Sequence, residues 1–219
     1  MLAPELNESI RRSLTELIRY ADELRDLDQA LGDGDLGITV SLGATAVIAA
    51  LEELPAEATP AEIAKACAKA FANANPSTMA ALVAGGLLAG SKTWADTTEV
   101  DVAAAARFIR AGGANIGQRG KTELGDKTIL DAIMPAADAL EAGTEAGTEA
   151  GTALDAAIAG AERAVVETRD LQSRRGRASW LQERSIGLQD PGATAFWRYL
   201  QSWRAANVAG AREMSGDLS

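Results

Sequence analysis

The sequence contains no histidine among its 219 residues, and it contains one cysteine. The lack of histidine excludes Ser-His-Asp and Cys-His catalysis, histidine-ligated zinc and a phosphohistidine carrier on this chain. Cys67 has no second cysteine with which to form an internal disulfide, which favours a reducing, cytoplasmic location. Because Cys67 stands in the helical pattern AKACAKAF, we expect a buried small side chain rather than a catalytic thiol.

Aromatic residues make up only 4% of the chain, and positive charge is in deficit, with a formal net charge of -10. Nucleic-acid-binding proteins usually carry a basic surplus. We therefore expect no nucleic acid as the main partner, while a local basic pocket stays open. No apolar run approaches the roughly 20 residues that span a bilayer, so we also expect no membrane partner.

Hydrophobic residues make up 47% of the chain, and alanine, the best helix former, is abundant. Apolar residues recur at helical spacing, beginning with Leu6, Ile10 and Leu14, and no convincing period-2 strand occurs. The pattern predicts eight helices, over residues 6–24, 38–53, 61–74, 77–94, 100–111, 129–141, 153–169 and 194–206. Mostly short connections favour antiparallel neighbours, so we expect an all-α bundle. We assign residues 1–210 to a single domain and 211–219 to a C-terminal tail.

Two segments carry further expectations. The helix over 77–94 is apolar nearly all round, so we expect it to be central, with Gly85, Gly86 and Gly90 allowing close helix contact. The repeat EAGTEAGTEAGT, residues 141–152, has no large apolar residue and is typical of a spacer or a frayed helix extension.

The stretch LDQALGDGDLGIT brings Asp28, Asp33 and Asp35 close together on a glycine-containing loop. Clustered carboxylates repel one another unless a cation is present, and hard oxygen ligands suit magnesium or calcium. The loop is too short for an EF-hand and lacks its distal glutamate. Since magnesium shares its coordination shell with substrate phosphates, the cluster indicates a metal–nucleotide site. A solvated Asp/Gly turn is the alternative interpretation.

Three other polar segments stand at predicted helix ends: GKTELGDKT, RRGRASW and QDPGAT. The last one precedes a helix start, where free amide groups favour anions. We expect these loops to gather metal, phosphate and base contacts at one rim, although GKT here is not a P-loop. Lys127 is expected to organise its loop, with phosphate contact as the alternative. The tryptophans are expected to be core or interface anchors, with Trp180 in GRASW as the exception.

Taken in order, these segments resemble one family, the nucleotide-binding L subunit or L domain of dihydroxyacetone kinases. The resembling pieces are LDQALGDGDLG, PSTMAALVAGGLLAG, RGKTELGDKTILDAIMP and GRASWLQERSIGLQDPGAT. They extend from Leu27 to Thr194, and the last two are long and specific.

The resemblance implies an eight-helix barrel that binds ADP or ATP at one end through two magnesium ions. It implies that Asp28, Asp33 and Asp35 ligate the metals and that Arg177 offsets the charge developing on the transferred phosphoryl group. The nucleotide contacts that it implies are Leu36, Gly37, Thr39, Ser77, Thr78, Gly120, Ile129, Arg177, Asp190, Pro191 and Gly192.

The sequence departs from the family's pattern at three positions. Leu36 replaces the histidine of the usual GDGDHG or GDADHG, which is expected to alter affinity or base contacts without removing a metal ligand. Met79 replaces a glycine that often follows the paired hydroxyls, which is expected to narrow the pocket. Leu188 stands where the family often has histidine after SIG.

The resemblance also implies that the nucleotide and the sugar bind to separate subunits or domains. In the family, a histidine of a separate K-type subunit or domain holds the sugar covalently, and this chain has no histidine and is too short to contain both parts. We therefore expect a phosphotransfer subunit that delivers phosphate to a small ketose held by a K-type partner. The phosphate source is either exchanging ATP or bound ADP that a phosphotransferase-system phosphocarrier rephosphorylates. A kinase subunit for another ketose such as erythrulose, and a non-catalytic regulatory module, are the alternatives. The oligomeric state, including a homodimer, stays open.

Overall fold

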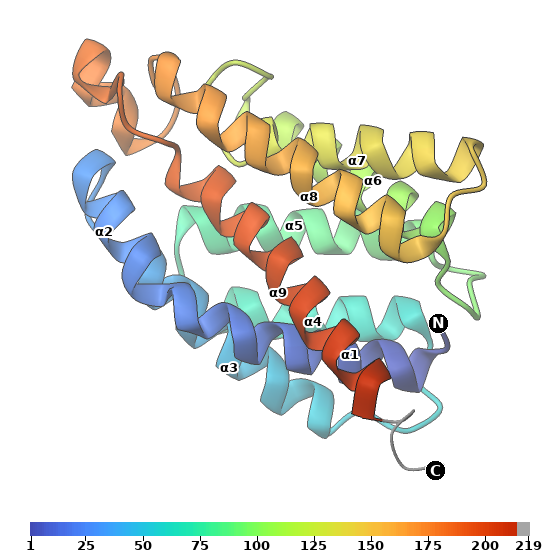
Figure 1. The fold of residues 1–219 in the computed structure, drawn as a ribbon. Coiled ribbons are helices and arrows are strands. Elements are labelled where there is room, and N and C mark those ends of the chain that lie inside the picture. The colour runs from blue at the N-terminus through green and yellow to red at the C-terminus, as the bar shows by residue number, and fades with distance from the viewer. Residues whose placement is uncertain (214–219) are drawn as a thin grey trace.

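The computed structural model describes residues 1–213, with side chains described through Asn207, and these residues fold almost entirely into helices (Figure 1). The α-helices are α1 (Ala3–Leu17), α2 (Ala21–Leu31), α3 (Leu36–Glu52), α4 (Pro60–Ala74), α5 (Thr78–Thr93), α6 (Val102–Gly120), α7 (Leu130–Glu145), α8 (Ala150–Glu167) and α9 (Pro191–Glu213). Short 3-10 segments cover η1 (Ile18–Tyr20), η2 (Thr168–Asp170) and η3 (Arg177–Ser185). An isolated β-bridge joins Leu2 to Glu99.

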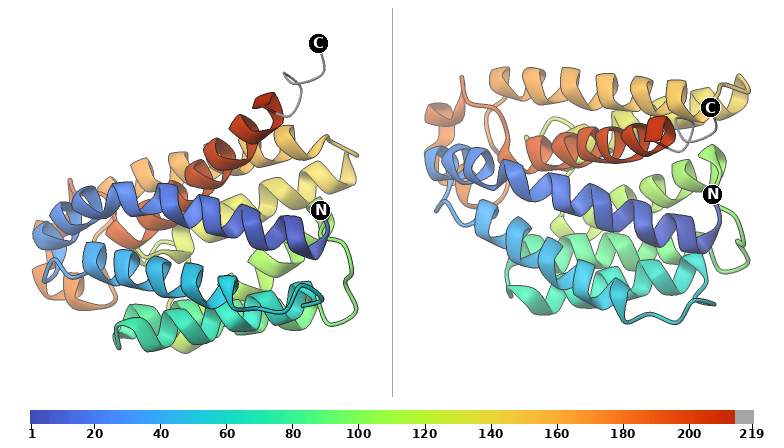
Figure 2. Two further views of the ribbon diagram at one scale, coloured as in Figure 1. Left: turned by 90° about the horizontal axis from the view of Figure 1, so that it is seen from below. Right: turned by 60° about the horizontal axis from the view of Figure 1, so that its bottom comes forward.

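The helices form a closed ring. From α3 onward each helix packs against the next one in the chain, and α9 returns to α1, which packs against α3 (Figures 1 and 2). The helices α1 and α2 make one side of this ring together, and η1 interrupts them. The all-α prediction of an eight-helix antiparallel barrel in a single domain is therefore confirmed. The N-terminus lies at the end of the barrel opposite the α2–α3 loop.

The expected central position of the helix over 77–94 is wrong. Helix α5 lies in the wall of the barrel, between α4 and α6. Its apolar character comes from its many small residues and not from burial on all sides. The predicted close helix contact is confirmed. A Cβ on Gly86 would lie 3.2 Å from the Gly112 carbonyl oxygen, and one on Gly90 would lie 2.7 Å from the Phe108 ring.

The helix boundaries differ from the predicted ones in several places, and α6 continues to Gly120, well past the predicted end at Ala111. The first predicted helix breaks at Ile18–Tyr20 into α1 and α2. Helices α7 and α8 both extend into the EAGT repeat and leave only a short turn near Gly147, so the repeat is largely helix extension. Helix α9 continues through Glu213, and the remainder of the predicted 211–219 tail lies outside the described residues.

Two hydrophobic clusters form the core. One is built mainly from α1, α3 and α4, the other from α7, α8 and α9, and Tyr199 packs against both. Cys67 is buried in the first cluster as predicted, and burial raises the pKa of its thiol to about 12. Over the part of the chain that the structure describes, no helix is both long and apolar enough to cross a bilayer.

Candidate functional site

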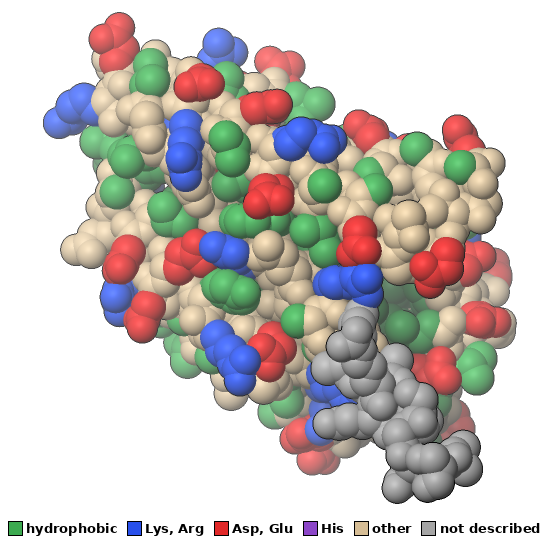
Figure 3. All heavy atoms as spheres, viewed as in Figure 1, with side chains coloured by type: hydrophobic (Ala, Val, Ile, Leu, Met, Phe, Trp, Pro, Cys, Tyr) green, Lys and Arg blue, Asp and Glu red, His purple; other side chains and the backbone are tan. Residues whose placement is uncertain are grey.

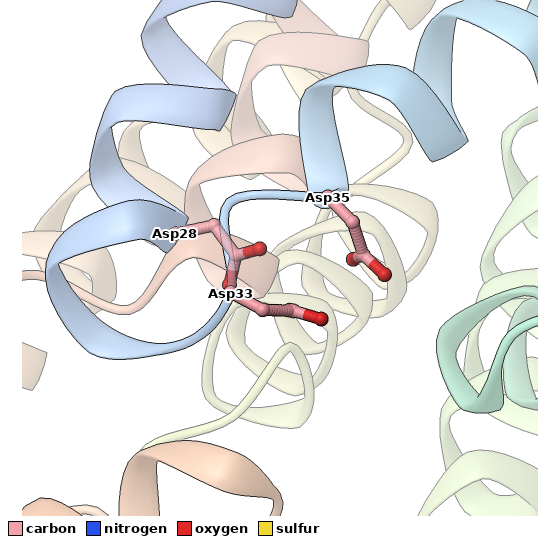
Figure 4. A group of neighbouring side chains, drawn as sticks. All are labelled: Asp28, Asp33 and Asp35. Atoms are coloured by element: carbon pink, nitrogen blue, oxygen red, sulfur yellow. The ribbon is translucent and has the colours of Figure 1, made fainter.

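The three aspartates lie close together (Figure 4), around the α2–α3 loop at one end of the barrel (Figure 1). Asp28 lies in the last turn of α2, and Asp35 occupies the N-cap position of α3. Between them Gly34 adopts a φ of +76°, which lets the chain turn sharply. One carboxylate oxygen from each aspartate lies within 4.8 Å of the other two. This set of hard oxygen donors fits magnesium, because a single ion can reach all three.

The backbone around the loop holds this arrangement in place. The Leu36 N–H donates to Asp28 Oδ2 at 3.1 Å, which orients the first carboxylate toward α3. A Cβ on Gly37 would lie 2.1 Å from the Ala21 carbonyl oxygen. Glycine at this position therefore allows α2 and α3 to approach closely enough to bring the aspartates together.

A cation from a distant part of the chain reaches the same cluster. Arg177, at the start of η3, forms an ion pair with Asp33. The preceding Gly176 adopts a φ of +64°, and Arg177 is exposed at the barrel rim. Asp33 and Arg177 are separated by most of the sequence. The fold therefore brings together a carboxylate cluster suited to a metal ion and an arginine suited to binding phosphate.

The GKTELGDKT loop is tied to the chain on both sides of Arg177. Lys127 is 1% exposed, and its Nζ donates to the carbonyl oxygens of Leu171 at 3.0 Å and Ser185 at 2.5 Å. Burial lowers the pKa of Lys127, and the nearby Asp190 carboxylate opposes that change. Lys127 therefore organises its loop, as predicted, and its ammonium group is already occupied by two carbonyls.

Asp126 makes a second contact between these segments, which the sequence pattern did not indicate. Its Oδ2 accepts from Arg175 Nε at 2.9 Å and from the Glu123 N–H at 3.1 Å. Burial raises the pKa of Asp126, but the hydrogen bonds from Arg175 and from the Glu123 N–H outweigh burial and leave the pKa below its usual range. The single lysine between two aspartates in GDKTILD was the available signal.

The start of α9 closes another side of the site. A Cβ on Gly192 would meet Met79 Cε at 3.1 Å and Ile129 Cβ at 3.3 Å, so α5, α7 and α9 converge there. Asp190 Oδ2 accepts from the Ala193 N–H at 2.7 Å and caps α9, whose first residue is Pro191. Burial raises the pKa of Asp190 to about 7 despite that hydrogen bond.

Several predicted nucleotide contacts have structural roles in the described chain. Leu36 lies in the hydrophobic core, and the buried Thr39 Oγ1 accepts from Asn75 Nδ2 at 2.9 Å. That bond joins α3 to the residues before α5, where Ser77 Oγ accepts from the Ala80 N–H. Thr78, the first residue of α5, is exposed. The sequence pattern did not indicate Asn75 either.

Gly120 ends α6 on the α5 side of the site. A Cβ there would lie 3.7 Å from Leu82 Cδ1, one turn into α5 from Thr78. The predicted rim therefore exists as a geometric feature: the α2–α3 loop, the α6–α7 loop, η3 and the start of α9 meet at one end of the barrel (Figures 1 and 2).

The fold and the site define a class of protein, an all-α barrel with a candidate divalent-metal site at one end. Comparison with known families identifies the family, because the family model described as the DAK2 domain matches residues 30–205. The chain belongs to this family.

Curated relatives agree with that assignment. The chain is 34% identical over 171 residues to the ADP-binding subunit DhaL of the PEP-dependent dihydroxyacetone kinase 1 of Listeria innocua, covering 78% of this chain and 79% of the relative. It is 32% identical over 183 residues to the Escherichia coli DhaL, covering 83% and 86%. An L-erythrulose 1-kinase of Mycolicibacterium smegmatis is 37% identical over 175 residues, covering 80% of this chain and 30% of that protein.

A solved structure supports the fold. The dihydroxyacetone kinase of C. freundii, in complex with AMP-PNP and Mg2+, superposes with a TM-score of 0.72 at 22% identity. The match covers 94% of this chain and 34% of that chain. The match thus spans most of the length of the DhaL relatives and about a third of the length of the longer kinases.

Proposed function

We propose that this chain is the magnesium–nucleotide phosphotransfer subunit of a dihydroxyacetone-type kinase. The observation that carries the proposal is the meeting of Asp28, Asp33 and Asp35 with Arg177 at one end of the barrel. The phosphates of a nucleotide need both metal-binding carboxylates and a cationic side chain, since they bind through metal ions and through cations or amides. The kinase names of the relatives support the same reaction class.

We propose a separate role for each group of site residues. Asp28, Asp33 and Asp35 would hold magnesium, for which we propose two ions, and bound magnesium neutralises charge on phosphate oxygens. Arg177 would turn from Asp33 to the transferred phosphoryl group and offset the charge that develops there. The start of α9 lies at the same rim, but Asp190 already caps its Ala193 N–H, so the free-amide anion site expected there is not available.

The acceptor is proposed to sit on another polypeptide. Phosphoryl transfer requires positioning and charge neutralisation more than a covalent catalyst, and this chain has no histidine to hold a ketose. A K-type subunit would present the sugar at the rim. The PEP-dependent names of two relatives favour bound ADP that a phosphocarrier recharges, and exchanging ATP is the other source.

The acceptor sugar has a second candidate. The similarity to an L-erythrulose 1-kinase favours a four-carbon ketose as the alternative to dihydroxyacetone. Because this chain holds the nucleotide in either case, the partner subunit decides between them. Reconstitution with K-type subunits of each kind, scored by transfer of labelled phosphate to each ketose, distinguishes the two.

Calorimetry with ADP and Mg2+ tests the proposal directly. The wild-type chain should bind ADP only with magnesium, and Asp33→Asn should weaken that binding by at least about tenfold. Asp26→Asn is a matched control, since Asp26 is an exposed aspartate of α2 outside the cluster and the charge change is the same. Magnesium-independent binding, or equal loss in both variants, contradicts the metal role. A variant that binds ADP normally yet transfers no phosphate would show that its substitution affects the transfer step and not nucleotide binding.

A further inference from the structure

Helices α4, α5 and α6 carry positive charge with almost no negative charge. No Asp or Glu occurs between Ile63 and Ala95 or between Val102 and Thr122, in a chain with a net charge of -10. The six cations of these helices are Lys65, Lys69, Lys92, Arg107, Arg110 and Arg119. Only Arg110 forms an ion pair with a described residue, on α7. By contrast, acidic and basic side chains are interspersed on the face of α8, α9 and α1 (Figure 3).

An open groove of about 320 Å³ runs between these three helices. The exposed Lys65, Lys92 and Arg119 stand along it, one from each helix. Its floor is apolar, and Leu88 of α5 remains 45% exposed within it. None of the aspartates of the acidic loop lines this groove. It is therefore a cationic surface with an apolar centre, separate from the candidate metal site.

The groove depends on a missing side chain. A Cβ on Gly85 would lie 2.9 Å from both Arg119 Nη1 and Asn115 Oδ1, so glycine lets these two groups lie against α5. Asn115 Oδ1 is buried and accepts no hydrogen bond from any described residue. A buried acceptor without a donor costs about 1–3 kcal/mol, so a ligand that supplies an N–H is favoured once the Asn115 side chain turns toward the groove.

We propose that this groove binds an acidic, amphipathic segment of a partner protein. Carboxylates of the segment pair with Lys65, Lys92 and Arg119, and an apolar side chain covers Leu88. An inorganic anion would satisfy the cations but offers no apolar surface for Leu88. An open groove between helices also suits an extended or helical segment. The inference goes beyond the proposed phosphotransfer and does not depend on it.

A short fluorescent helical peptide, with glutamates around a leucine stripe, is the probe. Anisotropy titration with the full chain should show binding that weakens as salt rises, because exposed charge pairs are screened. Lys65→Glu or Lys92→Glu should each weaken it by about three- to tenfold. Arg163→Glu on α8 is the matched control, since Arg163 is exposed and forms no ion pair with a described residue, and it should leave the affinity within about twofold.

Three outcomes overturn the inference. One is no binding of the glutamate peptide, and another is equal binding of a peptide with glutamine in place of glutamate. The third is inorganic phosphate binding that Lys65→Glu abolishes while the peptide does not bind, which would make the groove a small-anion site. Magnesium–ADP binding by Lys65→Glu should equal that of the wild type, so a failure here stays distinct from a failure of the nucleotide site.

Discussion

Asp190 illustrates, at the scale of one residue, how burial changes acid–base behaviour. Burial is the main cause that raises its pKa to about 7, and the nearby Asp131 carboxylate raises it further. The hydrogen bond from the Ala193 N–H and the charge of Lys127 lower this pKa. The ordinary pKa of an unfolded aspartate is about 3.9. The folded state therefore keeps a proton on Asp190 across a pH range in which the unfolded state has lost it.

The consequence is a loss of stability as pH rises. Between pH 4 and 7 the folded state binds more protons, so the free energy of unfolding should fall by up to about 1.4 kcal/mol per pH unit from this group. Asp190→Asn keeps an acceptor for the Ala193 N–H and removes the titration. Urea unfolding at pH 5 and pH 8 should show a smaller difference in the variant, and parallel pH profiles would contradict the assignment.

Residue patterns were most informative where the contacts are local. Asp28, Asp33 and Asp35 lie within eight positions, so their clustering followed from a short loop and from the chemistry of carboxylates. The ion pair of Asp33 with Arg177 joins positions too far apart for spacing to predict it. Asn75 was missed for the same reason, because its partner Thr39 lies on another helix.

At the scale of elements, the α2–α3 junction depends on Gly37. A methyl group there would meet the Ala21 carbonyl oxygen, part of a helix backbone that cannot easily move. Gly37→Ala should cost about 1–3 kcal/mol of stability and weaken magnesium–ADP binding, because the aspartates would separate. Chemical unfolding and calorimetry measure the two effects.

Gly151→Ala provides the matched control for Gly37→Ala. Gly151 is also the second residue of its helix, α8, but an added Cβ would meet only the Glu149 side chain, at 3.2 Å from Oε2. Since an exposed side chain can move, this variant should be neutral or gain up to about 1 kcal/mol from helix propensity. Equal destabilisation of the two variants would show that close packing of α2 on α3 is not the cause.

The second prediction at this scale concerns the segment around η3. Lys127→Met keeps most of the side-chain volume but removes the hydrogen bonds to the Leu171 and Ser185 carbonyls. Leaving these acceptors without a donor costs about 1–3 kcal/mol. Amide hydrogen exchange over residues 171–187 should therefore become faster, while exchange in α1 stays unchanged.

Lys121→Met is the control in the same loop. Both lysines have positive φ angles, 50° for Lys121 and 61° for Lys127, but Lys121 is exposed. Its substitution should leave exchange in residues 171–187 as in the wild type. Faster exchange in both variants would mean that the loop conformation, and not the buried ammonium, holds the segment.

At the scale of the whole molecule, the ring of helices joins two hydrophobic clusters. Tyr199 of α9 packs against both, and α9 itself lies between α1 and α8. We expect one cooperative unfolding transition, because neither cluster is closed without α9. Tryptophan fluorescence and far-UV circular dichroism should give coincident urea curves. Separated midpoints would mean that the two halves of the barrel unfold independently.

The sequence by itself determined the helical class, most helix positions and the identity of the acidic loop. Helical periodicity, proline and glycine signals and carboxylate chemistry are all local properties, so they can be read along the chain. Only the tertiary structure decided that α5 lies in the barrel wall, that Arg177 meets Asp33, and that Asp190 and Lys127 are buried together. These depend on closure of the ring, since burial and long-range charge pairing exist only after distant helices have packed.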